Sequence, residues 1–164
     1  MLFRSAEATY REALALHRAG GNQTMEAWSL HMLALVLVSQ KRPDEAKVAA
    51  REALTYFKEA GDVAGITLVL DDLSGVALVD NDLPRAGRMW GAARHLQAIT
   101  GTDLASFADT GFGSLGYTTA SQVLPPDDLE RYAAEGAAMS LDEAVAYAFE
   151  IGRASCRERV SDTV

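Results

Sequence analysis

The hydrophobic pattern from Trp28 to Gly61 predicts a helical hairpin. Residues 28–37 are apolar almost all round, which is typical of a buried helix. After a break at 40–43, the apolar residues keep the i, i+4, i+7, i+8 and i+11 spacing of one helical face: Ala46, Ala50, Ala53, Leu54 and Phe57. Pro43 suits the first turn of this second helix, because the first turn leaves its N–H groups unpaired and proline has none.

The hairpin recurs with a period of forty residues. Three sets of small residues coincide at this spacing: Ala6, Ala46 and Ala86; Ala13, Ala53 and Ala93; Gly21, Gly61 and Gly101. Helices touch closely only where side chains are small, so we expect Ala46 and Ala53 to mark helix contacts. The sequence therefore predicts an all-α array of antiparallel helical hairpins.

The order of large and small residues resembles the tetratricopeptide repeat, with Leu30 and Leu33 large, Ala34 small, Leu37 aliphatic, and then Ala46, Ala50 and Ala53. The resemblance extends over residues 5–101. It implies a tetratricopeptide-like array over residues 1–101, made of a half repeat and two full hairpins.

The first helix, predicted from Phe3 to Ala19, corresponds to the second helix of a repeat whose partner is missing. We expect Leu14 and Leu16 on its apolar side. An array that starts with a half repeat leaves one face uncovered, which suggests a fragment of a longer protein. A homodimer through this open half repeat would cover that face.

The repeat stops after Gly101. Residues 102–126 are rich in Gly, Thr and Ser and are predicted as a linker that ends at Pro125 and Pro126. Residues 127–149 are predicted as a last helix pair that caps the array. Its second helix starts at Ser140, because Ser140 and Glu143 form a capping box.

Two further segments resemble the tetratricopeptide arm of large bacterial, actinobacterial-type, ATP-dependent regulators of transcription related to the LuxR and SARP proteins. These segments are residues 88–94 with Thr100 and Gly101, and residues 135–145. In that family the arm accompanies an NTPase module and a DNA-binding module, and serves as a sensor and protein-contact surface. The resemblance implies a non-enzymatic interaction and sensing arm. The chain itself contains no Walker A motif and no recognisable helix-turn-helix.

By analogy with tetratricopeptide arrays, the first helix of each hairpin lines a concave groove that binds a protein or peptide partner. The groove residues predicted in this way are Trp28, His31, Leu35, Leu68, Asp71, Gly75 and Leu78. A second interpretation assigns most of them to the core. Asp71 and Asp72 are adjacent on a helix and point about 100° apart, so we expect them to be solvated or groove-lining rather than to share a ligand.

The sequence gives no candidate for catalysis, a metal or a cofactor. The histidines His17, His31 and His95 occupy different repeat positions without ligands at metal spacing, so we expect them at the surface or in the groove. Residues 111–116 match GxGxxG, but dinucleotide binding needs that motif between a strand and a helix. We predict no enzyme activity.

An alternative function is a small-molecule-binding or hydrolytic helical domain. It would use a cavity between the third repeat and the C-terminal helices, with Phe107, Phe112 and Tyr117 as possible walls. A third interpretation is a structural spacer that dimerises through its open end.

The net charge and the length of the apolar runs limit the classes of partner that the chain is expected to bind. The chain of 164 residues has a formal net charge of -8, which argues against direct contact with nucleic acid, since phosphates attract clustered Lys and Arg. The longest apolar run, residues 32–38, is too short to span a membrane. No secretion signal is recognised at the N-terminus, so we expect a cytoplasmic location.

The C-terminal residues 150–164 do not continue the helical pattern. Residues 150–160 resemble the translation of a common DNA-sequencing adapter, so we interpret 150–164 as a non-native tail and expect the native sequence to end near Phe149. The single cysteine, Cys156, lies in this tail and supports no disulfide or redox inference.

The predicted register leads to two stability predictions. Leu33→Ala should lower the free energy of unfolding by roughly 2 to 5 kcal/mol, because it leaves a cavity in the core. Ala53→Leu should lower it by about 1 to 3 kcal/mol by overpacking a helix contact. Urea denaturation of both variants tests the register, and free energies close to that of the original chain would refute it.

Overall fold

The structure, a computed structural model, describes residues 2–101 and 118–151. Within these residues it contains eight helices and no strand, which confirms the all-α class. None of these helices combines the length and the hydropathy needed to cross a membrane.

Five long helices form the first part of the chain: α1 (Leu2–Ala19), α2 (Gln23–Ser39), α3 (Pro43–Ala60), α4 (Val63–Val79) and α5 (Leu83–Thr100). The forty-residue period is visible in their ends. Residues 23, 39, 43 and 60 bound α2 and α3, and residues 63, 79, 83 and 100 bound α4 and α5. The period is therefore a property of the backbone as well as of the sequence.

The turns between the long helices repeat with the same period. Gly21, Gly61 and Gly101 all have a positive φ, between 64° and 70°, at the ends of α1, α3 and α5. Lys41 and Asn81 have φ values of 57° and 59° at the ends of α2 and α4. The turns after α1, α3 and α5 thus place glycine in the left-handed conformation, whereas the turns after α2 and α4 place Lys41 and Asn81 there.

Side-chain caps fix where the helices begin. Asn22, Asp62 and Asp82 each accept a hydrogen bond from a backbone N–H in the first turn of α2, α4 and α5. Each cap satisfies one of the N–H groups that a helix start leaves without a partner. The three caps again lie at intervals of twenty or forty residues.

The C-terminal region contains a short helix α7 (Ala120–Val123), then α8 (Pro126–Ala137) and α9 (Leu141–Glu150). Helix α7 lies inside the segment that the sequence predicts as linker. The last two helices match the predicted pair to within one residue at each end, and the capping box of Ser140 and Glu143 is confirmed.

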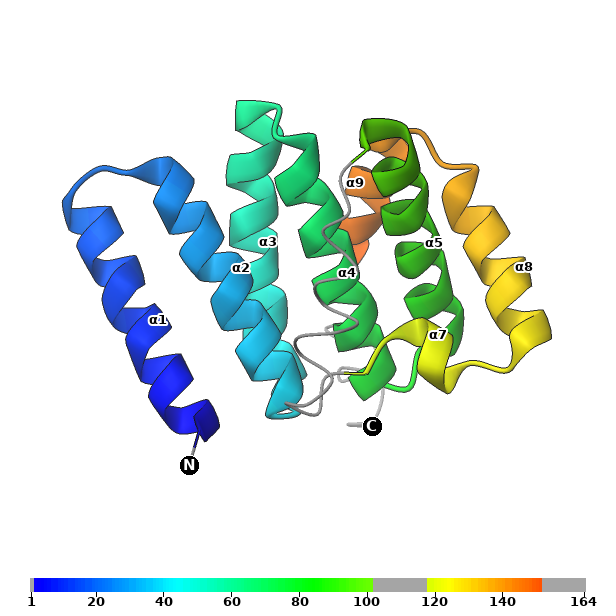
Figure 1. The fold of residues 1–164 in the computed structure, drawn as a ribbon, viewed down its shortest axis with the longest axis horizontal. Coiled ribbons are helices and arrows are strands. Elements are labelled where there is room, and N and C mark those ends of the chain that lie inside the picture. Colours follow the sequence, from blue (N-terminus) through cyan, green and yellow to red (C-terminus); the bar gives the residue numbers. More distant parts are fainter. Residues whose placement is uncertain (1, 102–117, 152–164) are drawn as a thin grey trace, which may run out of the picture.

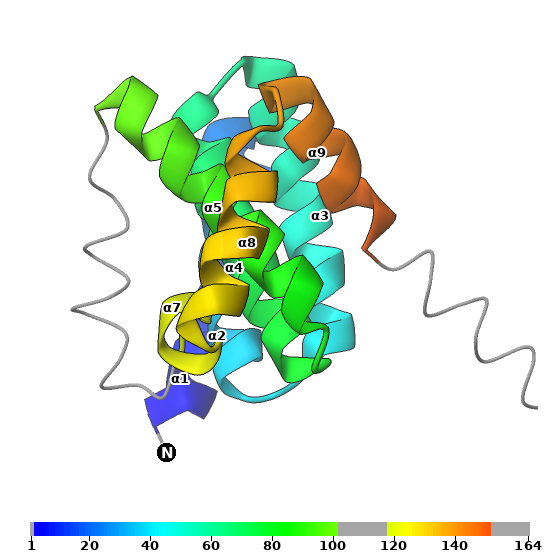
Figure 2. The same ribbon diagram turned by 90° about the vertical axis from the view of Figure 1, so that its right-hand side faces the viewer.

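The long helices follow one another along the longest axis of the molecule, with α8 packed beside α5 (Figure 1). Helix α9 does not continue this row. It returns to the side of α4 on which α3 lies, and it contacts α3, α4 and α5 (Figure 2). The Arg51 guanidinium of α3 donates a hydrogen bond to the carbonyl of Ile151 at 3.3 Å and lies over the Phe149 ring, which fastens α9 to α3.

The core contains alanines at the helix contacts and large apolar residues between them. Ala46, Ala50 and Ala53 are fully buried, and Leu33 and Phe57 are buried beside them, so these predictions are confirmed. The prediction for Leu16 is wrong. This side chain is 66% exposed, whereas Leu14 on the same helix is buried.

Helices α5 and α8 approach so closely that only glycine fits at their contact. A Cβ on Gly91 would overlap the backbone of Ala133, and a Cβ on Gly136 would overlap the carbonyl oxygen of Arg88. Both obstacles are backbone atoms, which do not move aside as the end of a flexible side chain does. The position of α8 therefore depends on the missing side chain of Gly136.

We expect Gly136→Ala to lower the free energy of unfolding by about 1 to 3 kcal/mol, because α8 must move away from α5. Gly20→Ala is the matched control. Nothing lies closer than 3.4 Å to a Cβ at Gly20, so the same chemical change should be neutral there. Urea denaturation measures both variants, and equal effects of the two would contradict the close contact.

Candidate functional site

The predicted groove residues lie on two neighbouring helices, α2 and α4. Three of them are partly exposed, namely Trp28, Leu68 and Leu78. The other four are buried: His31, Leu35, Asp71 and Gly75. Four of the seven are therefore core residues, as the second interpretation predicts, and only Trp28, Leu68 and Leu78 offer accessible surface.

A buried His–Asp pair joins the two helices. The Nδ1 atom of His31 lies 2.6 Å from a carboxylate oxygen of Asp72, forty-one residues further along the chain. The side chains are only 8% and 2% exposed, respectively. An ion pair or a charge-assisted hydrogen bond in such surroundings is strong but costs a large desolvation energy, so it fixes the arrangement of α2 and α4 more than it adds stability.

Burial and mutual attraction act against each other in this pair. Burial by itself lowers the pKa of His31, but the negative charges of Asp72 and Asp71 outweigh it, so the pKa of His31 lies above its usual value. Burial raises the pKa of Asp72, and His31 opposes this rise only in part. Both directions mean that the folded chain holds protons at this pair more tightly than the unfolded chain does.

A second charged pair extends the cluster to α5. The Arg94 guanidinium donates a hydrogen bond to a carboxylate oxygen of Asp71 at 3.1 Å and lies over the Trp90 ring, 5.3 Å from its centre. Arg94 also donates to the side chain of Gln97. We name His31, Asp71, Asp72 and Arg94 the polar cluster. It connects α2, α4 and α5 through side-chain contacts.

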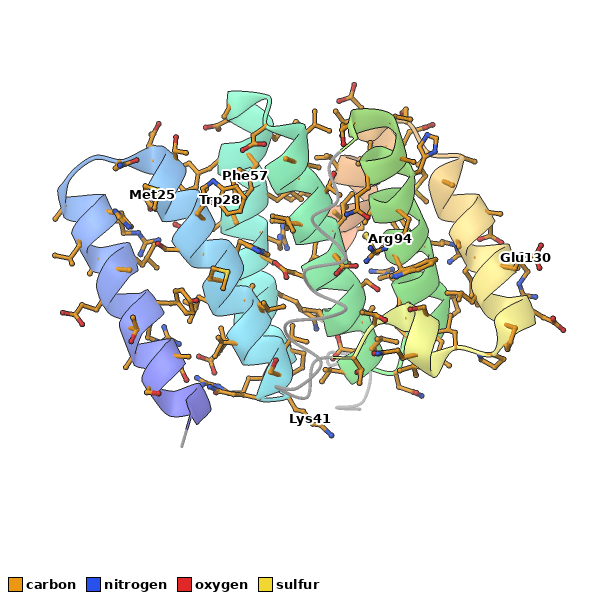
Figure 3. The ribbon with its side chains drawn as sticks, in the orientation of Figure 1. Met25, Trp28, Lys41, Phe57, Arg94 and Glu130 are labelled. Atoms are coloured by element: carbon orange, nitrogen blue, oxygen red, sulfur yellow. The ribbon has the colours of Figure 1, made fainter. Side chains whose placement is uncertain are left out.

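Aromatic contacts border the polar cluster on the side of α3. The Trp28 ring meets the Phe57 ring edge to face at 5.5 Å, and meets the His31 ring at 6.0 Å. Figure 3 shows Trp28 and Phe57 together, where α2 and α3 approach each other. Trp28 is therefore held by the core on one side while part of it stays accessible.

The two adjacent carboxylates serve different partners, as their angular separation on the helix predicts. Asp71 pairs with Arg94 on α5, and Asp72 pairs with His31 on α2. The expectation that Asp72 is solvated or groove-lining is wrong, since Asp72 is 1% exposed. His31 likewise lies inside the molecule rather than at its surface, and it does have a carboxylate partner.

Sequence reasoning missed Arg94 and the role of Asp72. The available signal was the occurrence of two acidic residues within the apolar run of α4, residues 66–79, because a buried carboxylate needs a partner. Which residue supplies that partner depends on how α2, α4 and α5 lie against each other. In the part of the chain that the structure describes, no group of three or more His, Cys, Asp or Glu side chains is arranged to hold a metal.

A shallow hollow lies between α8 and α9. It has a volume of about 400 Å³ and is lined by Ala138, Met139, Ala146, Tyr147 and the three glutamates Glu135, Glu143 and Glu150. The alternative function, a ligand-binding or hydrolytic domain, requires a closed cavity with convergent polar groups. Its proposed walls Phe107, Phe112 and Tyr117, the GxGxxG match and Cys156 all lie outside the described residues.

Comparison with known proteins gives no further guide. The chain matches no protein-family model, no curated protein and no solved structure.

The raised pKa values of His31 and Asp72 predict how stability depends on pH. The stabilisation from each group is complete at low pH and is lost as pH rises through its folded pKa, because the unfolded chain binds the proton less tightly. For His31 this loss begins above about pH 6.5. We therefore expect this pair to make the free energy of unfolding fall as the pH rises above about 6.5.

Urea denaturation across this pH range tests the effect. The double variant His31→Gln, Asp72→Asn should lose this part of the pH dependence. His95→Gln, which removes an exposed histidine on α5, should keep it. An unchanged pH dependence in the double variant would contradict the assignment.

Proposed function

We propose that the chain is a non-enzymatic protein-interaction and sensing arm of the tetratricopeptide kind. The observation that carries this proposal is the forty-residue repetition of helix ends, caps and left-handed turns. A helical repeat array uses its length to present an extended binding surface rather than a closed active site. The helix pairs resemble tetratricopeptide hairpins with a longer unit.

The packing of α2 and α4 supports the repeat interpretation. These first helices of successive hairpins contact each other, and each also contacts the second helix of its own hairpin. Equivalent positions carry equivalent burial, with Leu30 and Leu70 buried, and small Ala34 and Ser74 buried one turn later. Such agreement between sequence register and burial is what stacked repeats require.

The proposed partner is a protein or peptide segment with apolar side chains. Met25, Trp28 and Met32 share one face of α2 at i, i+3 and i+7, and all three are at least partly exposed. Leu68 and Leu78 add partly exposed apolar surface on α4. Half-exposed Met, Trp and Leu side chains on neighbouring helices are suited to bind another polypeptide.

The wider setting that we propose is a bacterial, signal-responsive regulator of transcription related to the LuxR and SARP proteins. It is supported by the residues 88–94 and 135–145 that resemble the family. Residues 88–94 lie on α5, and residues 135–145 run from the end of α8 through the turn at 138–140 into α9; helix α8 packs against α5. In this setting the chain contacts proteins inside the cell, and its negative charge keeps it from nucleic acid.

Selection of binding peptides from a random library tests the proposed function. Peptides that bind the chain should lose at least about tenfold in affinity to Leu68→Glu, since a charge replaces apolar contact on α4. Val48→Glu is the matched control, because Val48 is 67% exposed on α3, a helix that carries none of the groove residues.

Circular dichroism of both variants checks that the helices are intact. Peptides that bind the two variants equally well would show that α4 does not form the binding surface. Failure to select any peptide would contradict the proposal as a whole.

A further inference from the structure

The buried His31–Asp72 pair lies one side chain away from the surface. The His31 ring meets the Trp28 ring edge to face, with 6.0 Å between the ring centres. Trp28 is partly exposed, and it also packs on the buried ring of Phe57, beside which it lies in Figure 3. A change of charge at His31 therefore acts directly on a side chain of the predicted groove.

The two side chains of the pair share a proton. The Nδ1 atom of His31 and a carboxylate oxygen of Asp72 are 2.6 Å apart, so a proton on either group is held between them. Imidazolium with carboxylate and imidazole with carboxylic acid both give a pair without net charge. Loss of one proton leaves imidazole beside carboxylate, and this single negative charge lies on a side chain that is only 2% exposed. A buried charge without a partner is strongly unfavourable.

The carboxylates of α4 strengthen the binding of this proton. Asp71, which precedes Asp72 in the chain, accepts a hydrogen bond from Arg94 of α5 at 3.1 Å, so Arg94 is paired with Asp71 rather than with Asp72. Burial lowers the pKa of His31, but the negative charges of Asp72 and Asp71 raise it by more. The pair therefore keeps its proton up to a pH above 6.5, the usual pKa of histidine.

The polar side chains that α1 and α3 present to α2 are bonded to Glu26 rather than to the pair. Arg18 of α1 donates a hydrogen bond to the Glu26 carboxylate at 2.7 Å, and the Tyr56 hydroxyl of α3 donates to it at 3.1 Å. Glu26 precedes His31 by more than one turn of α2. Among the described residues, His31 is the only cationic group paired with Asp72. Once the proton has left, the charge of Asp72 must therefore be stabilised by water.

Water can approach the pair through the predicted groove. On α2 the residues one turn from His31 are buried except for Trp28, and on α4 those one turn from Asp72 are buried except for Leu68. The buried neighbours are Ala27, Ala34 and Leu35 on α2, and Val69, Gly75 and Val76 on α4. Trp28 and Leu68, which the sequence places in the groove, are therefore the partly exposed neighbours of the pair.

We propose that the proton shared by His31 and Asp72 regulates the predicted groove at Trp28 and Leu68. While the proton is bound, the Trp28 ring stays packed on His31 and Phe57. When the proton is lost, water enters beside Trp28 to reach Asp72, and the ring moves away from His31. A polypeptide partner then binds more weakly, because the surface that it contacts is no longer preformed. This inference rests on the proposed function, since it assigns a regulation to the same surface, but the opening can be measured without a partner.

The fluorescence of Trp28 tests the opening. Trp90→Phe leaves Trp28 as the only tryptophan of the chain and keeps an aromatic ring beside Arg94. Quenching by acrylamide is measured between about pH 5.5 and 9, a range that brackets the usual pKa of histidine. We expect the quenching constant to rise at least about twofold in a single-proton step above about pH 6.5, because local opening lets the quencher reach the ring.

Two histidine variants in the same background are the controls. The double variant His31→Gln, Asp72→Asn keeps two side chains that can form a hydrogen bond but cannot titrate, so the step should be absent. His95→Gln removes an exposed histidine of α5, so the step should remain. Quenching that does not change with pH, or the same step in the double variant, would overturn the proposal.

NMR of the chain without substitutions gives the answer if the variants fail to fold. The ring resonances of His31 and the indole N–H resonance of Trp28 are followed over the same pH range. Both should change with one common midpoint, which lies at a higher pH than the midpoint of His95. A Trp28 resonance that stays unchanged while His31 titrates would overturn the proposal.

Peptides selected against the chain connect the opening to binding. For peptides that lack histidine and have blocked ends, the affinity should fall as the pH rises through the midpoint of His31, by at most about tenfold per pH unit, because one proton is linked to binding. The double variant should bind them equally well across this range. An affinity of the original chain that does not depend on pH would overturn the regulation. Failure to select any peptide contradicts the proposed function, whereas the quenching of Trp28 still decides whether the pair opens the groove.

Discussion

Close approach between neighbouring helices is the constraint on which the rest of the structure depends. Fully buried alanines at 46, 53, 86 and 93 let the two helices of each hairpin come together, and large residues such as Phe57 fill the space beside them. The contact between α5 and α8 carries the same principle further, since Gly136 lies against the backbone of α5 itself. These contacts leave no space for larger side chains. They therefore determine how far apart the helices lie and which residues meet between them.

The polar cluster is a consequence of that spacing. The carboxylate of Asp72 reaches His31 only because α2 and α4 are neighbours, and Arg94 reaches Asp71 only because α4 and α5 are. A buried charge without its partner costs several kcal/mol, so the cluster penalises any shift of one helix along another. Apolar contacts tolerate such shifts better, since hydrophobic attraction has no direction. The cluster therefore specifies the stacking that the alanines permit.

Much of this architecture could be predicted from periodicity alone. The forty-residue spacing predicts the hairpins and their ends, and the capping box of Ser140 and Glu143 predicts the start of α9, because both signals are local. The partners of His31 and Asp71 could not be predicted, since they lie on other helices and depend on tertiary packing. The burial of Leu16 could not be predicted for a related reason. An apolar residue on an amphipathic helix predicts a contact but does not show which neighbour supplies it.

The return of α9 to α3 alters the way in which the row of helices unfolds. A simple solenoid has only neighbour-to-neighbour interactions, so its ends can open independently of its middle. Here the hydrogen bond from Arg51 to the carbonyl of Ile151 joins residues one hundred positions apart. Contacts of such long sequence separation form late, after a large loss of chain entropy, and they slow folding. Once formed, they couple the C-terminal helices to the middle of the row of helices. Loss of α9 therefore exposes surface on α3, α4 and α5 together.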